Sequence, residues 1–181
     1  LMVAYRRCAH GGKELMLVSG YSGTGKSALV REVHKPITES HGYFIEGKFD
    51  QFQRAVPYFA ILKAFEEMTN ILLTESQSVL DGFRISIQEA VGTEGKVITD
   101  VIPQLEKIIG PQPPVPEVGG AEAQNRFNYV FRKLIHVLAS KEHPLVLFID
   151  DLQWADSSSL SLLQVLMTDR DSKHLLCICA Y

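Results

Sequence analysis

The chain has 181 residues, enough for one domain with a substantial hydrophobic core, and its 46% hydrophobic and 22% charged residues are ordinary for a globular domain. The formal net charge is only −3, so the overall charge favours neither nucleic acid nor an acidic membrane surface. No apolar run approaches the roughly 20 residues that a membrane-spanning helix requires. We therefore expect no membrane span and no nucleic-acid binding by this chain.

The first predicted elements are a strand over residues 14–20 and a helix over residues 26–40. The residues that join them fit the phosphate-binding pattern G-x-x-x-x-G-K-[ST]. In such a loop, glycines let backbone N–H groups wrap a phosphate chain, and the following helix adds its positive dipole end. The matching segment reads Gly20-Tyr21-Ser22-Gly23-Thr24-Gly25-Lys26-Ser27.

The residue types of this loop predict a nucleotide site. We expect Lys26 to reach the β- and γ-phosphates, where it would also be catalytic, and the Ser27 hydroxyl to ligate Mg²⁺. The alternative is a glycine-rich turn without a ligand, but strand, loop and helix follow one another in the order that a phosphate site needs. The predicted phosphate-binding residues are Gly20, Ser22, Gly23, Thr24, Gly25, Lys26, Ser27 and Ala28.

The middle of the chain is predicted to be helical. After a second strand over residues 43–50, apolar residues recur at helical spacing over residues 61–91, and Gly92 ends that helix. The segment around Pro103 keeps the periodicity, but the proline predicts a broken helix. A stretch rich in proline and glycine follows it. We therefore expect a helical insertion over about residues 57–120.

Four further elements complete an α/β pattern. A strong helix is predicted over residues 121–140, and a strand over residues 144–151 has a continuous apolar run that indicates burial on both faces. A short helix over residues 157–168 and a strand over residues 174–181 come next. Strands that alternate with helices predict a mainly parallel sheet between helical layers, which is a three-layer αβα sandwich.

Two adjacent acids end the buried strand. Asp150 lies at the carboxyl end of a parallel strand, as in a Walker B strand, and ligands bind at this edge of open α/β sheets. We expect it to hold Mg²⁺ together with Ser27. Asp151 points elsewhere and is the candidate catalytic acid that orients the attacking water. The alternative for both acids is a strand-end turn with solvated carboxylates.

Four other residues have roles that the sequence leaves open. Lys48 and Asp50, at the end of the second strand, should emerge at the same edge of the sheet, where they would face the γ-phosphate or the metal, or be ordinary loop charges. Arg126 is either an internal phosphate sensor or, as we favour, a helix-surface arginine. Trp154 is expected to pack against the acidic loop rather than to stack on a base.

The three cysteines are expected to be buried and reduced. Cys177 and Cys179 point to the same face of the last strand, and with Cys8 they look like small hydrophobic residues rather than a disulfide framework. This cysteine usage favours a reducing, cytoplasmic location. The six histidines are scattered without metal-ligand spacing, so we assign no metal other than Mg²⁺.

Four segments together resemble a known family. They are residues 21–27, 47–51, 122–127 and 150–156, of which the last reads Asp-Asp-Leu-Gln-Trp-Ala-Asp. The chain resembles the AAA-like ATPase module of the STAND class of P-loop NTPases, in the version found inside multi-sensor serine/threonine–histidine signalling kinases. The resemblance spans nearly the whole chain.

The resemblance implies a P-loop fold whose fourth strand lies between the first and the third. It implies ATP bound at residues 20–27, Mg²⁺ at Asp150 and a candidate catalytic acid at Asp151. The implied partners are kinase-like and sensor domains of the same polypeptide, with self-association as a further option. The family has an arginine after the fourth strand, so we expect residues 1–181 to be one ATPase core within a larger protein, hydrolysing ATP weakly or not at all by itself.

We expect the module to act as a nucleotide switch that binds ATP and hydrolyses it slowly. One alternative is a DNA-associated ATPase of the origin-recognition or transcription-activator type, but no basic, aromatic-bearing recognition module is visible. Another is a small-molecule kinase, which needs an arginine-bearing lid, and residues 167–173 offer only Arg170. A scaffold that binds nucleotide without hydrolysing it is the remaining competitor.

Overall fold

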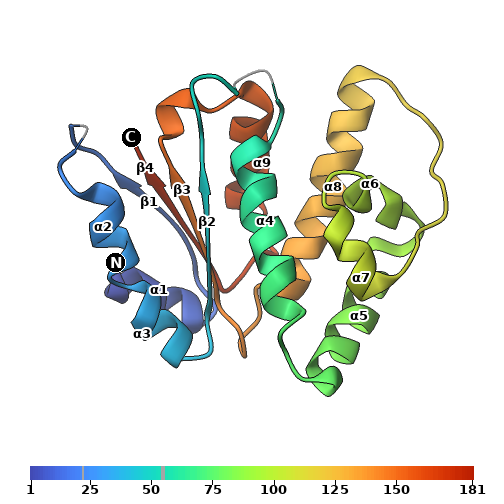
Figure 1. The fold of residues 1–181 in the computed structure, drawn as a ribbon, viewed down its shortest axis with the longest axis horizontal. Helices are drawn as coiled ribbons and strands as arrows, with labels where there is room; N and C mark the ends of the chain where they lie inside the picture. The colour runs from blue at the N-terminus through green and yellow to red at the C-terminus, as the bar shows by residue number, and fades with distance from the viewer. Residues whose placement is uncertain (22, 54–55) are drawn as a thin grey trace. The chain divides into compact units, whose positions relative to one another are not determined.

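The computed structural model describes residues 1–21, 23–53 and 56–181. Ser22, one of the predicted phosphate-binding residues, lies outside these described residues. In the described chain, four parallel strands form one sheet in the order β1-β4-β3-β2 (Figure 1). This order confirms the predicted fold, with the fourth strand between the first and the third. The strands are β1 (Lys13–Val18), β2 (Tyr43–Lys48), β3 (Leu145–Asp150) and β4 (Leu175–Ala180).

The parallel register brings the carboxyl ends of the strands to one edge of the sheet. Lys48, the last residue of β2, lies opposite Asp150, the last residue of β3, and Val18 of β1 lies opposite Ala180 of β4. Both β3 and β4 are buried along their whole length, which agrees with their continuous apolar sequences. The loops after β2 and β3 therefore leave the sheet from fixed, neighbouring points.

The chain divides into two compact units. The first comprises residues Leu1–Ala64 and Leu138–Tyr181 and contains the sheet, and the second comprises residues Phe65–Val137. In the first unit, α1, α2 and α3 cover one face of the sheet and α9 lies on the other, which gives the predicted three layers (Figure 1). These helices are α1 (Met2–Ala9), α2 (Lys26–Arg31), α3 (His34–Glu39) and α9 (Ser157–Thr168).

Helix α1 was not expected from the sequence. Its residues Ala4, Tyr5 and Cys8 are buried in the same hydrophobic cluster as Phe148 of β3 and Ile178 of β4. An eight-residue helix is too short to be stable alone, so packing against the sheet rather than local propensity stabilises it. Its two arginines, which follow the first buried residues, interrupt the apolar pattern that would have revealed it.

The predicted helix over residues 26–40 is wrong in one respect, because the structure has two helices there. Helix α2 ends at Arg31, and α3 begins at His34. The cause is Pro36, which has no N–H to donate to the carbonyl four residues earlier and whose ring clashes with that carbonyl. The chain turns before the proline, so that Pro36 sits in the first turn of α3, where a missing N–H is tolerated.

Every described element between β2 and β3 is helical, as predicted for the insertion. The apolar run over residues 61–91 forms two helices rather than one, with a turn at residues 73–76 in which the Thr74 hydroxyl donates to the Ile71 carbonyl (2.7 Å). The segment around Pro103 is broken into short pieces, as the proline predicted. The elements are α4 (Phe59–Leu72), α5 (Gln77–Val91), η1 (Gly92–Glu94), α6 (Gly95–Thr99), η2 (Pro103–Leu105), α7 (Glu106–Ile109) and α8 (Gly120–Leu138).

The second unit has a core of its own. The rings of Phe65 and Phe131 meet edge to face with centroids 4.8 Å apart, and both side chains are fully buried. Side chains of α5 hold the end of α7, because Arg84 donates to the Ile108 carbonyl and Gln88 to the Ile109 carbonyl, each at 2.8 Å. Among the described residues, no helix is both long and apolar enough to cross a membrane.

Candidate functional site

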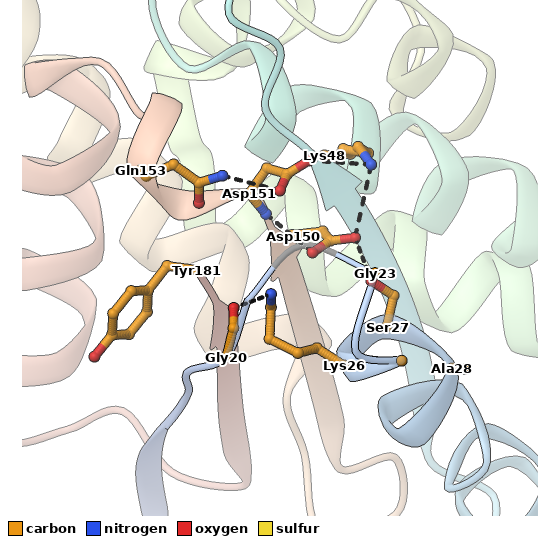
Figure 2. Close-up of a pocket in the computed structure, with 11 residues that line it drawn as sticks. Gly20, Gly23, Lys26, Ser27, Ala28, Lys48, Asp150, Asp151, Gln153 and Tyr181 are labelled. Atoms are coloured by element: carbon orange, nitrogen blue, oxygen red, sulfur yellow. Dashed lines mark hydrogen bonds and ion pairs between the residues drawn. The ribbon is translucent and has the colours of Figure 1, made fainter.

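A cavity of about 490 Å³ lies at the carboxyl edge of the sheet (Figure 2). This volume is within the usual range for small-ligand pockets, about 300–1,000 Å³. It brings together most of the predicted phosphate-binding residues and both predicted acids, with one residue whose role the sequence left open, Lys48, and two to which the sequence gave no site role. The predicted residues are Gly20, Gly23, Gly25, Lys26, Ser27, Ala28, Asp150 and Asp151, and the additional ones are Lys48, Gln153 and Tyr181.

One wall of the cavity is the phosphate loop, residues 20–27 without the undescribed Ser22. Gly23 and Gly25 have φ values of +83° and +87°, a left-handed conformation that favours glycine. Thr24, which was also predicted to bind phosphate, donates its hydroxyl to the Tyr21 carbonyl at 2.8 Å. The Lys26 ammonium folds back onto the loop and donates to the carbonyl of Gly20 at 2.6 Å. In the described part of the loop, backbone carbonyls therefore hold the lysine at the cavity.

Ser27 and Asp150 meet at the base of the cavity. The Ser27 hydroxyl donates to Oδ2 of Asp150 at 2.6 Å, and Oδ1 of the same carboxylate accepts the N–H of Asp151 at 3.0 Å. Asp150 is buried, with 7% of its surface exposed. Ser27 lies in the first turn of α2 and Asp150 ends β3, so two segments 123 residues apart in the chain place a hydroxyl and a carboxylate side by side.

Asp151 is held by two side chains. Its carboxylate pairs with the Lys48 ammonium at 3.0 Å and accepts the side-chain N–H of Gln153 at 3.0 Å. The backbone of Asp151 is left-handed, with φ +55°, a conformation that aspartate adopts more readily than most residues. This turn directs its carboxylate away from that of Asp150 and toward β2 (Figure 2). Although Lys48 lies near both acids, their hydrogen-bond partners differ, so they can have different roles.

The charges around Asp151 keep it ionised. Partial burial raises the pKa of Asp151, but the hydrogen bonds from Lys48 and Gln153 and the positive charges of Lys48 and Lys26 outweigh it, so the pKa lies below its usual value. The same hydrogen bond, with the charge of Asp151, raises the pKa of Lys48. Both groups are therefore charged at neutral pH, and Asp151 acts as a hydrogen-bond acceptor.

Lys48 is the main site residue whose role the sequence left open. Its ammonium lies 3.0 Å from Asp151 and 3.9 Å from Asp150, so it joins β2 to both acids. The signal that could have placed it is the strand register, because the last residues of β2 and β3 are direct neighbours. Tyr181 enters through its backbone, since its carbonyl accepts the Gly20 N–H at 3.3 Å and its N–H donates to Val18 at 3.1 Å.

The other three residues whose roles the sequence left open do not line this cavity. Asp50 accepts the N–H of Phe52 at 2.9 Å in a local turn. Arg126 belongs to the second unit, where it donates to the Pro116 carbonyl at 2.8 Å. Trp154 ends a short 3-10 helix after β3 (η3, Leu152–Trp154) and lines, beside Lys48 and Asp151, an adjoining cavity of about 610 Å³.

The donors at this site suit Mg²⁺ bound together with phosphate. Mg²⁺ prefers oxygen ligands and is usually held by one or two carboxylates, with waters and substrate phosphates completing its shell. Asp150 and Ser27 supply one carboxylate and one hydroxyl at the cavity. Among the described residues, no group of three histidines, cysteines or acids could hold a metal through protein ligands alone. The oxygen donors therefore fit a metal that arrives with a nucleotide.

Comparison with known proteins agrees with this fold. Residues 1–178 match the model of the family described as the AAA ATPase domain. The chain is also 39% identical over 167 residues to the hybrid signal transduction histidine kinase G of Dictyostelium discoideum. That match covers 92% of this chain but only 5% of the much longer kinase. The chain therefore belongs to the AAA ATPase domain family and is similar to a segment of a signalling kinase.

Proposed function

We propose that the chain binds ATP with Mg²⁺ and hydrolyses it slowly, as a nucleotide switch within a multidomain signalling protein. The observation that carries this proposal is the single cavity that contains Lys26, Ser27, Asp150 and Asp151. A phosphate-binding loop without acids would bind phosphate only, whereas hydrolysis also needs a metal ligand and a residue that orients water. All of these groups line the same cavity.

Each group has a role that follows from its chemistry. The Lys26 ammonium would exchange its bonds to loop carbonyls for bonds to phosphate oxygens, which are stronger because both partners are charged. Ser27 and Asp150 would hold Mg²⁺, which neutralises charge that develops on the phosphates. Asp151, which stays ionised, would accept a hydrogen bond from the attacking water and so orient it.

The state of Asp151 supports slow rather than fast hydrolysis. Its carboxylate is already engaged by Lys48 and Gln153, and its pKa is held below the usual value. A water molecule must compete with these two partners for the acceptor positions of this carboxylate. Lys48 would be drawn toward an incoming phosphate by charge, which would release Asp151 to bind water. Nucleotide binding and the position of Lys48 are then linked.

A signalling context is supported by the similarity to the histidine kinase. The similar protein is a signal transduction histidine kinase, so we propose other domains of the same polypeptide as partners of this module.

The three cysteines are free and buried, and burial raises the pKa of Cys8 and of Cys179 to about 11. Such thiols are unreactive. They are compatible with the reducing cytoplasm that we propose as the location.

The proposal is tested by the Lys26→Ala variant, with Lys35→Ala as its control. Hydrogen bonds to charged groups contribute about 1.5–3 kcal/mol, so removing Lys26 should weaken ATP binding by about 10- to 150-fold. The fold should survive, because Lys26 is only partly buried and, among the described residues, its ammonium bonds to the Gly20 and Tyr21 carbonyls of its own loop. Lys35 is an exposed lysine of α3 that pairs only loosely with Glu39 at 3.7 Å, and its removal should leave the affinity unchanged. Equal affinities of Lys26→Ala and wild type in calorimetric titration would contradict the proposal.

A further inference from the structure

The loop after β3 is anchored at both ends by acids. Asp151 begins it and is bound to Lys48, and Asp156 ends it as the residue that precedes α9. Between them runs the short 3-10 helix η3, in which the N–H of Trp154 donates to the carbonyl of Asp151 at 2.9 Å. The position of the candidate catalytic acid therefore depends on what holds the far end of this loop.

The Asp156 carboxylate accepts three hydrogen bonds, two from the nearby Ser159 and one from Tyr58, which is far from it in the chain. Oδ1 accepts the backbone N–H of Ser159 at 2.9 Å, and Oδ2 accepts the hydroxyl of Ser159 at 2.6 Å. These two bonds cap the N-terminus of α9. Oδ2 also accepts the backbone N–H of Tyr58 at 3.3 Å, 98 residues earlier in the chain. Capping α9 requires the first bonds but not the bond to Tyr58, so Asp156 has a second function.

The bond to Tyr58 supports a strained backbone. Tyr58 has φ +62°, in the left-handed region, which is unfavourable for a residue that carries a side chain. Its carbonyl accepts the N–H of Leu62 at 2.9 Å, which is the first hydrogen bond of α4. Asp156 thus holds the residue from which α4 starts in a conformation that the chain would not otherwise favour.

The start of α4 also touches β2 beside the candidate site. A Cβ atom built at Gly47 would lie only 2.0 Å from the carbonyl oxygen of Ala60, so the backbones of β2 and α4 are in direct contact there. Lys48 is the next residue of β2, and it is the ion-pair partner of Asp151. The loop that Asp156 ends is therefore connected to β2 in two ways. One is the ion pair of Asp151 with Lys48, and the other runs from Asp156 through the start of α4 to Gly47.

We propose that Asp156 is a positioning residue. It holds the loop of Asp151 against the first turn of α4, and it thereby keeps the Asp151 carboxylate next to the Lys48 ammonium at the cavity. This role rests on the proposed ATPase function and adds to it a residue that touches neither nucleotide nor metal. It gives the last aspartate of the Asp150–Asp156 segment a use beyond the cap of α9. Displacements of about 1 Å at a reacting group lower rates by up to about 10²-fold, so loss of this tie should slow turnover.

The test compares Asp156→Asn with Ser159→Ala in the full chain. Asparagine has one acceptor oxygen in place of two, so it can accept the backbone N–H of Ser159 or that of Tyr58 but not both, because these two groups donate to different oxygens of Asp156. We expect phosphate release by Asp156→Asn to fall by about tenfold or more, with ATP affinity within about twofold of wild type, because Asp156 is not among the described residues that line the cavity. Exchange of the Tyr58 amide, followed by NMR, should accelerate. Ser159→Ala removes the hydroxyl, keeps the bond to Tyr58 and should leave both measurements near wild type.

A second variant separates positioning from simple loss of the cap. Glycine adopts a positive φ without strain, so in Tyr58→Gly the start of α4 should depend less on the hydrogen bond from residue 58 to Asp156. We expect the Asp156→Asn/Tyr58→Gly double variant to recover much of the turnover that Asp156→Asn loses, with Tyr58→Gly alone as the reference. Wild-type turnover in Asp156→Asn, or no recovery in the double variant, would overturn the role of Asp156. A wild-type chain that binds no ATP would instead contradict the proposed function itself.

Discussion

The two loops that form the candidate site are held in place in different ways. The phosphate loop, residues 20–27, is shaped by glycines and by bonds from Lys26 and Thr24 to carbonyls of the loop itself. The acidic loop, residues 151–156, is bonded to two segments far from it in the chain, namely the Lys48 side chain of β2 and the backbone N–H of Tyr58 before α4, which donates to Asp156. The turn of the phosphate loop is therefore set mainly by its own residues, although its two ends are bonded to Tyr181 and Asp150. The acidic loop depends more on the tertiary structure.

This difference indicates what each loop does. A locally determined loop can bind phosphate in much the same way whatever the rest of the fold does. A loop tied to β2 and α4 can respond to their positions, and α4 continues from the first unit into the second. We infer that affinity resides mainly in the phosphate loop and that the control of turnover resides in the acidic loop.

The largest effect is expected for Asp151→Asn. Asparagine tolerates the left-handed backbone at this position, so the variant should fold, but it lacks the charge that binds and orients water. Positioned acids and bases contribute about 10²- to 10⁴-fold, and we expect the rate of phosphate release to fall by about 10²-fold or more. ATP affinity should stay within about twofold of wild type by titration. A variant that turns over at the wild-type rate would show that Asp151 is not the catalytic acid.

Asp150→Asn should affect metal dependence instead. The substitution removes the charge of the predicted Mg²⁺ ligand, while the amide oxygen can still accept the Ser27 hydroxyl. Loss of a charged contact of about 1.5–3 kcal/mol should weaken the Mg²⁺-dependent part of ATP affinity by about tenfold or more. Titrations with ATP in Mg²⁺ and in chelator measure that part. If the two variants lose affinity and rate to the same extent, the separate roles of the two acids are refuted.

Gly47→Ala tests the contact beneath the acidic loop. A methyl group at Gly47 would meet the Ala60 carbonyl at 2.0 Å, and overpacking of this kind costs about 1–3 kcal/mol. The free energy of unfolding should therefore fall by about 2 kcal/mol in denaturant titration. Gly82→Ala is the matched control, because no atom lies within 4 Å of its added methyl and alanine favours the helix by about 0.4–1 kcal/mol. Equal stability of the two variants would mean that α4 does not press on β2.

The smallest effect that we expect is the decrease in the free energy of unfolding caused by Lys48→Met. The Lys48 side chain is 67% exposed and that of Asp151 is 31% exposed, so solvent screening limits the pair to less than about 1 kcal/mol. The pair raises the pKa of Lys48 and lowers that of Asp151. Its stabilisation is therefore present between their ordinary values, 3.8 for aspartate and 10.5 for lysine. It is lost as the pH falls through the lowered pKa of Asp151 or rises through the raised pKa of Lys48.

The measurement for this variant is the unfolding free energy as a function of pH. Wild type should exceed Lys48→Met slightly near pH 7, and the two curves should converge at acid pH as Asp151 is protonated. The matched control is Lys63→Met, which changes a lysine outside the ion pair with Asp151. A constant difference between wild type and Lys48→Met down to acid pH would show that the ion pair is not its cause.

The comparison of the two loops also explains what the sequence could predict. The phosphate loop is a local pattern, and the order of strands and helices around it predicted a parallel α/β fold that the sheet confirms. The partners of the acidic loop lie about 100 residues away from it, at Lys48 and Tyr58, and no local pattern connects them. The break between α2 and α3 could have been predicted from Pro36, whereas α1 depends on packing that only the tertiary structure provides.

The central claim is that ATP and Mg²⁺ occupy the cavity between the phosphate loop and the two acids. Its most direct test is an NMR titration of the ¹⁵N-labelled chain with ATP, first without Mg²⁺ and then with it. ATP alone should shift the amides of Gly20, Gly23, Gly25 and Lys26, and Mg²⁺ should add shifts at Ser27, Asp150 and Asp151. Shifts that cluster away from this cavity, or no shifts at millimolar ATP, would contradict the account.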